Sequence, residues 1–317
     1  MISVIIPTYC SVKYLPQTLE SVCNQSYPEF EILCIDDAST DDTVRIIEEF
    51  ATKDSRIRLL THPHNLGSPA FGRNTGLAEA RGEFVTFLDH DDSFEPTKLE
   101  RQLTSIHEQK VDFLCSNIYL LNHQTNKKDM LAWGNITGDP KKGFLGRLLQ
   151  SNFVPPNSTL IRRSVFETVG VFDTSLKGVD DYDMWYRIVR AFPASILPEP
   201  LATWRYANTS SISSNEIAML LDEIRFYEKI TSNTIKSEEW EKQSALQGIK
   251  RDHWLIGHRL LANGNYTEAY RHYSLADKQA WADRVMQLPW AVRGLYAIKR
   301  AVTPAFSPLN LDFTPYE

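Results

Sequence analysis

Apolar and polar positions along the first 120 residues follow two alternating patterns. Short continuous apolar runs, typical of buried strands, alternate with segments whose apolar positions recur at helical spacing. This alternation indicates βαβ units around a largely parallel sheet. The predicted strands are Ile2–Ile6, Phe30–Ile35, Ile57–Leu60, Phe84–Leu88 and Val111–Leu121. The predicted helices contain the stripes Leu15/Leu19/Val22/Cys23, Val44/Ile47/Ala51 and Leu99/Leu103/Ile106. Ser39-x-x-Asp42 resembles a capping box that would begin the second helix.

The pattern changes after this region. Asn122–Lys142 is polar, with Asn, Gln, Lys and two Gly, which predicts a long mobile loop. Ser158–Arg162 then predicts a strand, and Val179–Phe192 predicts a helix with Met184 and Trp185 among its apolar positions.

Strand patterns end at about residue 213, and helical patterns continue to about residue 302. They include a helical hairpin over Trp254–Ala276 with Gly264-Asn265 at its turn. We therefore expect an α/β domain over 1–212, with halves of about 1–120 and 121–212, and a helical region over 213–317.

Composition and charge exclude several classes of protein. The 317 residues are 42% apolar and 23% charged, which is ordinary for a globular protein in water. The net charge is 34 − 40 = −6 without a Lys/Arg block, so a nucleic-acid partner is not expected. No apolar run approaches the ~20 residues of a membrane span, and MISVIIPTYC lacks the basic start of a signal peptide. The four cysteines show no CxxC spacing, so the expected location is the cytoplasm.

Acidic residues follow directly on two predicted strands. Asp89-His90-Asp91-Asp92 comes after the Phe84–Leu88 strand, and the carboxyl end of a parallel sheet is where ligands bind. Clustered carboxylates repel one another unless a cation is present, and hard oxygen ligands suit Mg²⁺ or Mn²⁺ held jointly with a diphosphate. The alternative is a solvated acidic loop that caps the next helix.

Asp36 and Asp37 end the second strand in the same way. Their carboxylates can hydrogen-bond the base or ribose of a nucleotide; the alternative, capping of the next helix, is a role that Ser39 would already fill. In the glycine-containing segment Asn65–Gly82, the backbone can approach a ligand closely and Arg73 can reach a phosphate. The motifs GxxxxGK[ST] and GxGxxG are missing, which disfavours P-loop phosphoryl transfer and Rossmann hydride transfer.

A third acidic group opens the predicted helix near residue 180. Asp180, Asp181 and Asp183 fall in its first turn, where a rigid element can present carboxylates to a ligand. The helix dipole also favours acidic residues in that turn, so a purely structural role is the alternative.

In this order and spacing, the motifs resemble the family 2 inverting glycosyltransferases of the GT-A fold over roughly residues 1–212. The segments that carry the resemblance are SVIIPTYC, YLPQTLESVCNQSYPEFEILCIDDASTDDT, NLGSPAFGRNTGLAEARGEFVTFLDHDD, FETVGVFDTSLKGVDDYDMWYRI and WRYANTSSIS. The resemblance implies a Rossmann-like, mostly parallel sheet flanked by helices, followed by an all-helical extension.

The resemblance also implies roles for individual residues. Donor-binding positions are Pro7, Thr8 and Tyr9 in the nucleotide pocket, Asp37 at the base, Asp36 orienting its loop, Arg73 near the nucleotide, and Asp89 at the ribose or a metal-bound water. Asp91, with Asp89, would hold Mn²⁺ or Mg²⁺. Asp181 matches the family's general base, while Asp180 stands where the family usually has Glu. Trp185, Arg205 and Asn208 are candidates for contacts with the acceptor or the diphosphate; Asn208 replaces a customary His.

The implied activity is transfer of a sugar, by single displacement with inversion, from a nucleotide diphosphate sugar to an acceptor hydroxyl. A UDP-sugar is the expected donor, and a glycan or lipid-linked glycan of a surface polysaccharide or glycolipid is the expected acceptor. One alternative is a sugar nucleotidyltransferase, which would need a Gly-rich basic loop where Pro7–Lys13 stands. Another is a non-catalytic sugar-nucleotide-binding scaffold, against which the intact acidic motifs argue.

Basic and apolar positions segregate in the C-terminal region. In a helix from Pro289, Arg293 and Arg300 share one side, and Leu295, Ile298 and Val302 share another. Such a helix either lies on an anionic membrane, at the inner face of the cell membrane, or packs on the catalytic domain or a second subunit of a homodimer.

Overall fold

The computed structural model describes residues 1–131, 143–206, 215–232 and 234–276. Two compact units are present, Met1–Gly248 and Ile249–Glu317. The first unit therefore continues past residue 212, where the strand patterns of the sequence end, and includes helix α8 (Glu216–Thr231).

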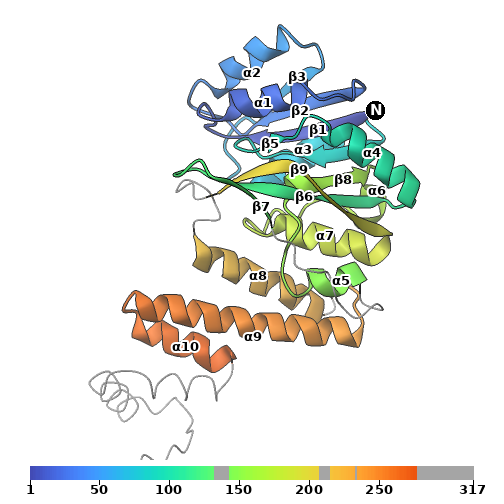
Figure 1. The fold of residues 1–317 in the computed structure, drawn as a ribbon. Helices are drawn as coiled ribbons and strands as arrows, with labels where there is room; N and C mark the ends of the chain where they lie inside the picture. Colours follow the sequence, from blue (N-terminus) through green and yellow to red (C-terminus); the bar gives the residue numbers. More distant parts are fainter. Residues whose placement is uncertain (132–142, 207–214, 233, 277–317) are drawn as a thin grey trace, which may run out of the picture. The chain divides into compact units, whose positions relative to one another are not determined.

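One nine-stranded sheet forms the centre of the first unit in its described part, in the order β3-β2-β1-β4-β8-β6-β9-β5, with β7 paired to β6 (Figure 1). The first four strands of this order are parallel and confirm the predicted βαβ units. Their bounds are β1 Ile2–Thr8, β2 Phe30–Asp36, β3 Ile57–Thr61 and β4 Phe84–Phe87. β1 and β2 are buried along their whole length, which explains their largely apolar sequence.

The other half of the sheet is mixed. β8 is antiparallel to both β4 and β6, whereas β9 is parallel to β6. The bounds are β5 Ser93–Phe94, β6 Phe113–Asn122, β7 Lys128–Met130, β8 Thr159–Arg162 and β9 Ala194–Tyr206. The sequence did not predict β9, because Pro198 and Pro200 interrupt it; the structure accommodates them where the pairing register with β6 shifts.

The polar stretch Asn122–Lys142 is not entirely a loop. Its first part turns back, and β7 pairs antiparallel with the end of β6. The predicted mobility of its remainder, 132–142, concerns residues outside the described part of the chain, as does the predicted basic amphipathic helix near 289–302.

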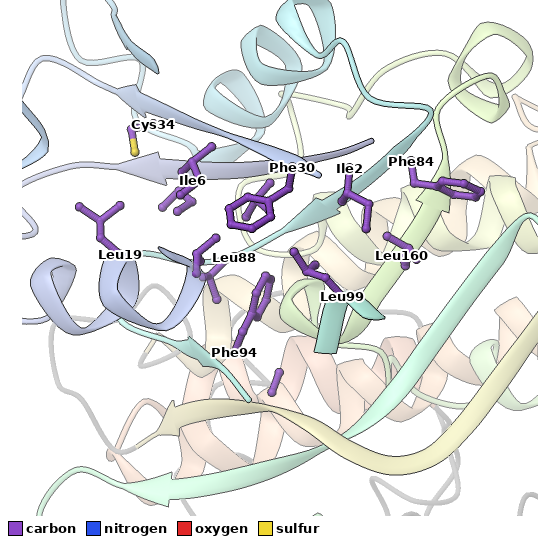
Figure 2. Close-up of a cluster of buried hydrophobic side chains, with 14 of the residues drawn as sticks. Ile2, Ile6, Leu19, Phe30, Cys34, Phe84, Leu88, Phe94, Leu99 and Leu160 are labelled. Carbon is purple, nitrogen blue, oxygen red and sulfur yellow. The ribbon is translucent and has the colours of Figure 1, made fainter. Parts of the chain in front are cut away.

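Helices cover both faces of the sheet. Ile2, Val4 and Ile6 of β1 belong to a cluster with side chains of α1 and α4, shown in Figure 2. Successive side chains of a strand point to opposite faces of the sheet, so Ile5 lies on the other face, where it packs against Gly76 of α3. The helices of this unit are α1 Leu15–Cys23, α2 Thr43–Ala51, α3 Pro69–Glu79, α4 Lys98–Gln109, α5 Gly143–Leu148, α6 Val165–Val169, α7 Asp180–Ala191, α8 and the start of α9 Glu239–Ala262, with a 3₁₀ turn, η1, at Pro156–Ser158.

Two local interpretations of the sequence are wrong. Ser39 does not cap α2, which begins after Asp42; the Ser39 hydroxyl instead donates to Asp36 Oδ1 at 2.5 Å, because the loop folds back onto β2. Gly72 and Gly76 lie within α3 and let it pack closely on β1, rather than letting backbone approach a ligand. A Cβ at Gly72 would lie 3.0 Å from Pro7 Cβ, and one at Gly76 would overlap the Ile5 side chain.

The second unit contains the predicted helical hairpin. The end of α9 and α10 (Tyr266–Ala276) are joined through Gly264, whose φ of +75° suits the turn. The Tyr273 ring of α10 packs on Gly257 of α9. Among the described residues, no helix is both long enough and apolar enough to cross a membrane.

The close packing of α3 on β1 predicts that Gly76→Ala destabilises the first unit. The added methyl group would have to displace Ile5, and overpacking of this kind costs about 1–3 kcal/mol. Urea denaturation measures the loss, with Ala78→Ser on the exposed side of the same helix as the control. Equal stability of the two variants would contradict the packing described here.

Candidate functional site

The carboxyl ends of β1, β2 and β4 meet at one edge of the sheet, since these strands are parallel. This edge brings together Tyr9, the Asp36-Asp37 pair and the loop Asp89–Asp92, which follow those strands in the sequence. The predicted grouping of acidic motifs at one sheet edge is therefore present.

Asp36 ties the β2–α2 loop to the end of β1. Its side chain is buried and accepts hydrogen bonds from the Thr8 hydroxyl at 3.2 Å and from the Ser39 backbone N–H at 2.9 Å. Pro7 and Thr8 are buried as well, whereas Tyr9 is 46% exposed. Of the three residues expected in a nucleotide pocket, Tyr9 is thus the one whose side chain is exposed.

Asp37 is held by the loop that precedes α3. Its carboxylate accepts the backbone N–H groups of Leu66 and Gly67 at 3.0 and 3.2 Å, and it lies 2.8 Å from His62 Nδ1. The other ring nitrogen of His62 lies 2.9 Å from the Thr75 hydroxyl. His62 was not among the site residues predicted from the sequence, although its place just after β3, at the same edge of the sheet, was an available signal.

Arg73 is the buried centre of the site. Its side chain is 4% exposed, and its two terminal nitrogens bind Asp180 Oδ2 at 2.6 Å and Asp89 Oδ1 at 2.9 Å. The sequence predicts that Arg73 lies near the nucleotide. In the structure, the guanidinium joins two carboxylates of the chain, one after β4 and one at the start of α7.

Asp180 and Asp181 differ in their surroundings. Asp180 is buried and paired with Arg73. Its side chain, although shorter than that of the Glu that the family usually has here, therefore still reaches a charged partner. Asp181 is only partly buried; its carboxylate accepts the Asn152 amide at 3.2 Å and the Tyr182 backbone N–H at 2.7 Å. Desolvation, and then the Asp180 charge, raise the pKa of Asp181 to about 7. Asp181 is therefore the carboxylate of this pair that an external proton donor can reach.

Asp92 anchors the Asp89–Asp92 loop from inside the protein. Its buried carboxylate accepts the Arg205 backbone N–H at 2.9 Å and the Asn157 amide at 2.7 Å. Burial and the negative charges of Asp91 and Asp89 raise the pKa of Asp92. The Arg205 side chain also donates from Nε to the Asp91 carbonyl at 3.1 Å. The sequence did not predict this role for Asp92, whose partners come from η1 and β9.

The carboxylates of Asp89 and Asp91 fit a hard divalent cation that is shared with a ligand. Asp89 is 35% exposed and uses one oxygen for Arg73, while Asp91 is partly buried. Within the described ranges, no group of three or more His, Cys, Asp or Glu side chains could hold a metal ion by itself. Mg²⁺-type sites commonly use one or two carboxylates and complete the coordination with phosphate oxygens and water, so the donor set present suits that arrangement.

Other candidates lie away from this site. Trp185 is fully buried, and its indole N–H donates to the Val154 carbonyl at 3.0 Å. The structure does not bring Trp185 to an acceptor surface, because its side chain packs among Phe87, Phe113 and Phe172. Asp183 pairs with Arg187 and Lys229, which is a structural role. Asn208 lies outside the described residues.

Comparison with known proteins gives the same picture for fold and family. The family model described as glycosyl transferase family 2 matches residues 3–170. An uncharacterized glycosyltransferase of Haemophilus influenzae is 31% identical over 230 residues, which cover 72% of this chain and 88% of that protein. The Escherichia coli enzyme WfaP, a UDP-Glc:alpha-D-GlcNAc-diphosphoundecaprenol beta-1,3-glucosyltransferase, is 29% identical over 258 residues, covering 81% and 90%.

A solved structure supports the fold. The crystal structure of S. aureus TarS 1-349 in complex with UDP-GlcNAc matches with a TM-score of 0.61 and 20% identity, covering 87% of this chain and 90% of that one. The predicted GT-A-type architecture is confirmed by this likeness together with the mixed sheet and its flanking helices.

The buried position of Arg73 predicts a large loss of stability in Arg73→Met. The variant would leave the Asp180 and Asp89 carboxylates without their cation, and breaking a buried ion pair costs about 3–5 kcal/mol. Arg73→Met/Asp180→Asn should recover part of the loss, because one of the two unpaired charges is then removed. Urea denaturation measures both, with the exposed Arg45→Met as control; a loss no larger than that of the control would contradict the buried bridge.

Proposed function

The chain belongs to glycosyl transferase family 2, and on that premise we propose that it transfers a sugar from a nucleotide diphosphate sugar to an acceptor hydroxyl with inversion at the anomeric carbon. The observation that carries the proposal is the chain of contacts from Asp89 through Arg73 to Asp180. It fixes the acidic loop after β4 relative to the start of α7, where the next residue is the accessible carboxylate Asp181.

Asp181 is the proposed general base. It takes the proton from the acceptor hydroxyl while the oxygen forms a bond to the anomeric carbon and the bond to the diphosphate breaks. The pKa of Asp181 is raised to about 7, close to neutral pH. A carboxylate with this pKa is a stronger base than one with the ordinary pKa of aspartate. Asn152 and the Tyr182 N–H orient the carboxylate in the structure.

The acidic loop is the proposed diphosphate end of the donor site. Asp91 and Asp89 would hold Mn²⁺ or Mg²⁺, which when bound supplies neutralising charge for the departing diphosphate. Asp92 keeps the loop in place through Arg205 and Asn157. Tyr9, with its exposed side chain, and Asp37, directly after β2, would contact the base.

Relatives suggest the class of substrates. The name of WfaP gives UDP-Glc as donor and a diphosphoundecaprenol-linked sugar as acceptor, and TarS 1-349 was solved with UDP-GlcNAc. We therefore propose a UDP-sugar donor and a glycan or lipid-linked glycan acceptor, in the synthesis of a surface polysaccharide or glycolipid.

A donor screen tests this function. The protein is incubated with UDP-Glc, UDP-GlcNAc, UDP-Gal and GDP-Man, with and without a GlcNAc-diphospholipid and with Mn²⁺ or Mg²⁺, and free nucleoside diphosphate and product are measured. Release of UDP that depends on the acceptor is expected. Release of pyrophosphate from a nucleoside triphosphate and a sugar phosphate, without sugar transfer, would indicate a nucleotidyltransferase instead.

Asp181→Asn is expected to lower turnover by about 10²–10⁴-fold, the usual contribution of a general base. Donor affinity should change little, because Asn keeps the shape of the side chain. The base acts only when deprotonated, so wild-type turnover should rise with pH and level off above about 7, and fall about tenfold per unit below it. If Asp180→Asn were inactive and Asp181→Asn active, the assignment would be shifted by one residue.

Asp91→Asn should abolish transfer and weaken diphosphate binding, since the proposed metal loses a charged oxygen ligand. Turnover and the affinity for UDP are measured across a Mn²⁺ titration. Asp42→Asn, a carboxylate exposed at the start of α2, is the matched control and should behave as wild type. Near wild-type turnover of Asp91→Asn in Mn²⁺ would remove Asp91 from the site.

A further inference from the structure

Three basic side chains from separate parts of the first unit surround the ring of Tyr14. The Lys13 Nζ lies 4.9 Å from the ring centroid and the Arg205 guanidinium carbon 4.4 Å from it. His123, just beyond β6, has Nδ1 2.7 Å from the Tyr14 hydroxyl and Nε2 3.3 Å from Lys13 Nζ. We refer to Lys13, His123 and Arg205 as the Tyr14 cluster.

The two permanent cations of the Tyr14 cluster lack a carboxylate partner within the part of the chain that the structure describes. Arg205 donates to neutral oxygens, the Asp91 carbonyl and Gln17 Oε1 at 3.2 Å. Other basic residues of this unit do pair with acids, as Arg56 does with Asp54. Two like charges gathered at one aromatic ring repel each other, and an anion bound between them would relieve that repulsion.

The Tyr14 cluster lies next to the acidic loop after β4. Arg205 contacts this loop twice, through its backbone N–H to Asp92 and through its side chain to Asp91. The other members follow β1 and β6, and β1, β4, β6 and β9 all run in the same direction, which places their carboxyl ends at one edge. A ligand that reaches the acidic loop is therefore within reach of the cluster.

We propose that the Tyr14 cluster binds a phosphate or diphosphate group of a substrate. Lys13 and Arg205 supply charge-assisted donors. His123, held by the Tyr14 hydroxyl through Nδ1, positions Lys13 through Nε2. This proposal rests on the proposed function, in which a diphosphate occurs in two substrates, the nucleotide sugar and a lipid-linked acceptor. The shared chemistry is the diphosphate, and experiment can separate the two sources.

The first experiment needs neither a metal nor a transferred sugar. Calorimetry measures binding of inorganic pyrophosphate to the full chain in EDTA at low salt. Lys13→Gln and His123→Gln should weaken binding, by about three- to tenfold for Lys13→Gln, since one exposed charge-assisted contact contributes on the order of 1 kcal/mol. The matched control is Lys53→Gln, which removes the same charge from an exposed lysine resting on the Phe50 ring at the end of α2.

Unchanged pyrophosphate affinity in Lys13→Gln, or a loss equal to that of Lys53→Gln, would overturn the proposal. Because the measurement does not depend on sugar transfer, it tests the cluster separately from the proposed function. The cluster can fail to bind pyrophosphate in a protein that transfers a sugar, and it can bind pyrophosphate in a protein that does not. The unfolding midpoint of each variant is measured alongside and should match wild type, since Lys13 is exposed.

A second pair of measurements identifies the source of the diphosphate. Binding of UDP and of farnesyl diphosphate, an isoprenyl diphosphate without a nucleotide, is compared for wild type and Lys13→Gln in the same buffer. A loss confined to UDP assigns the cluster to the donor, and a loss confined to farnesyl diphosphate assigns it to a lipid-linked acceptor. Equal losses would mean that the cluster recognises the diphosphate in either substrate, and no loss with either would contradict a substrate site.

Discussion

The buried guanidinium of Arg73 is the constraint on which the site depends. A cation removed from water is strongly destabilising unless carboxylates compensate it with good geometry. Here the compensation comes from Asp89, after β4, and Asp180, at the start of α7. The ion pairs can form only when α3, the acidic loop and α7 are correctly positioned relative to one another. The energetic need to pair one buried charge thus positions Asp181 relative to the acidic loop.

The acidic loop is fixed from a second direction by Asp92. Its carboxylate binds the backbone of β9 through Arg205 and the side chain of Asn157 in η1. β4 is also the strand at which the parallel half of the sheet meets the mixed half. The loop after it is consequently held by Arg73 on one side and by the mixed half on the other. This leaves Asp89 and Asp91 in a defined position, at which the proposed cation and phosphate would bind.

The site combines both signs of charge although the chain is acidic overall. Burial, and then repulsion from Asp91 and Asp89, raise the pKa of Asp92, and a bound cation would reduce that repulsion. The Tyr14 cluster places positive charge directly beside this loop, where Arg205 contacts Asp91 and Asp92. Opposite charges at adjacent positions suit a ligand that presents both a metal-binding and a cation-binding face, as a diphosphate does.

The sequence by itself determined the parallel strands and the place of the acidic motifs, because strands buried on both faces are largely apolar and the acidic motifs come at the carboxyl ends of these strands. Tertiary structure decided the partners. Arg73 meets Asp180 only when residues 107 positions apart come together, and no local pattern encodes that contact. Tertiary structure likewise placed Trp185 in the core. It also formed β9 despite the prolines of this strand, because pairing with β6 outweighed local propensity.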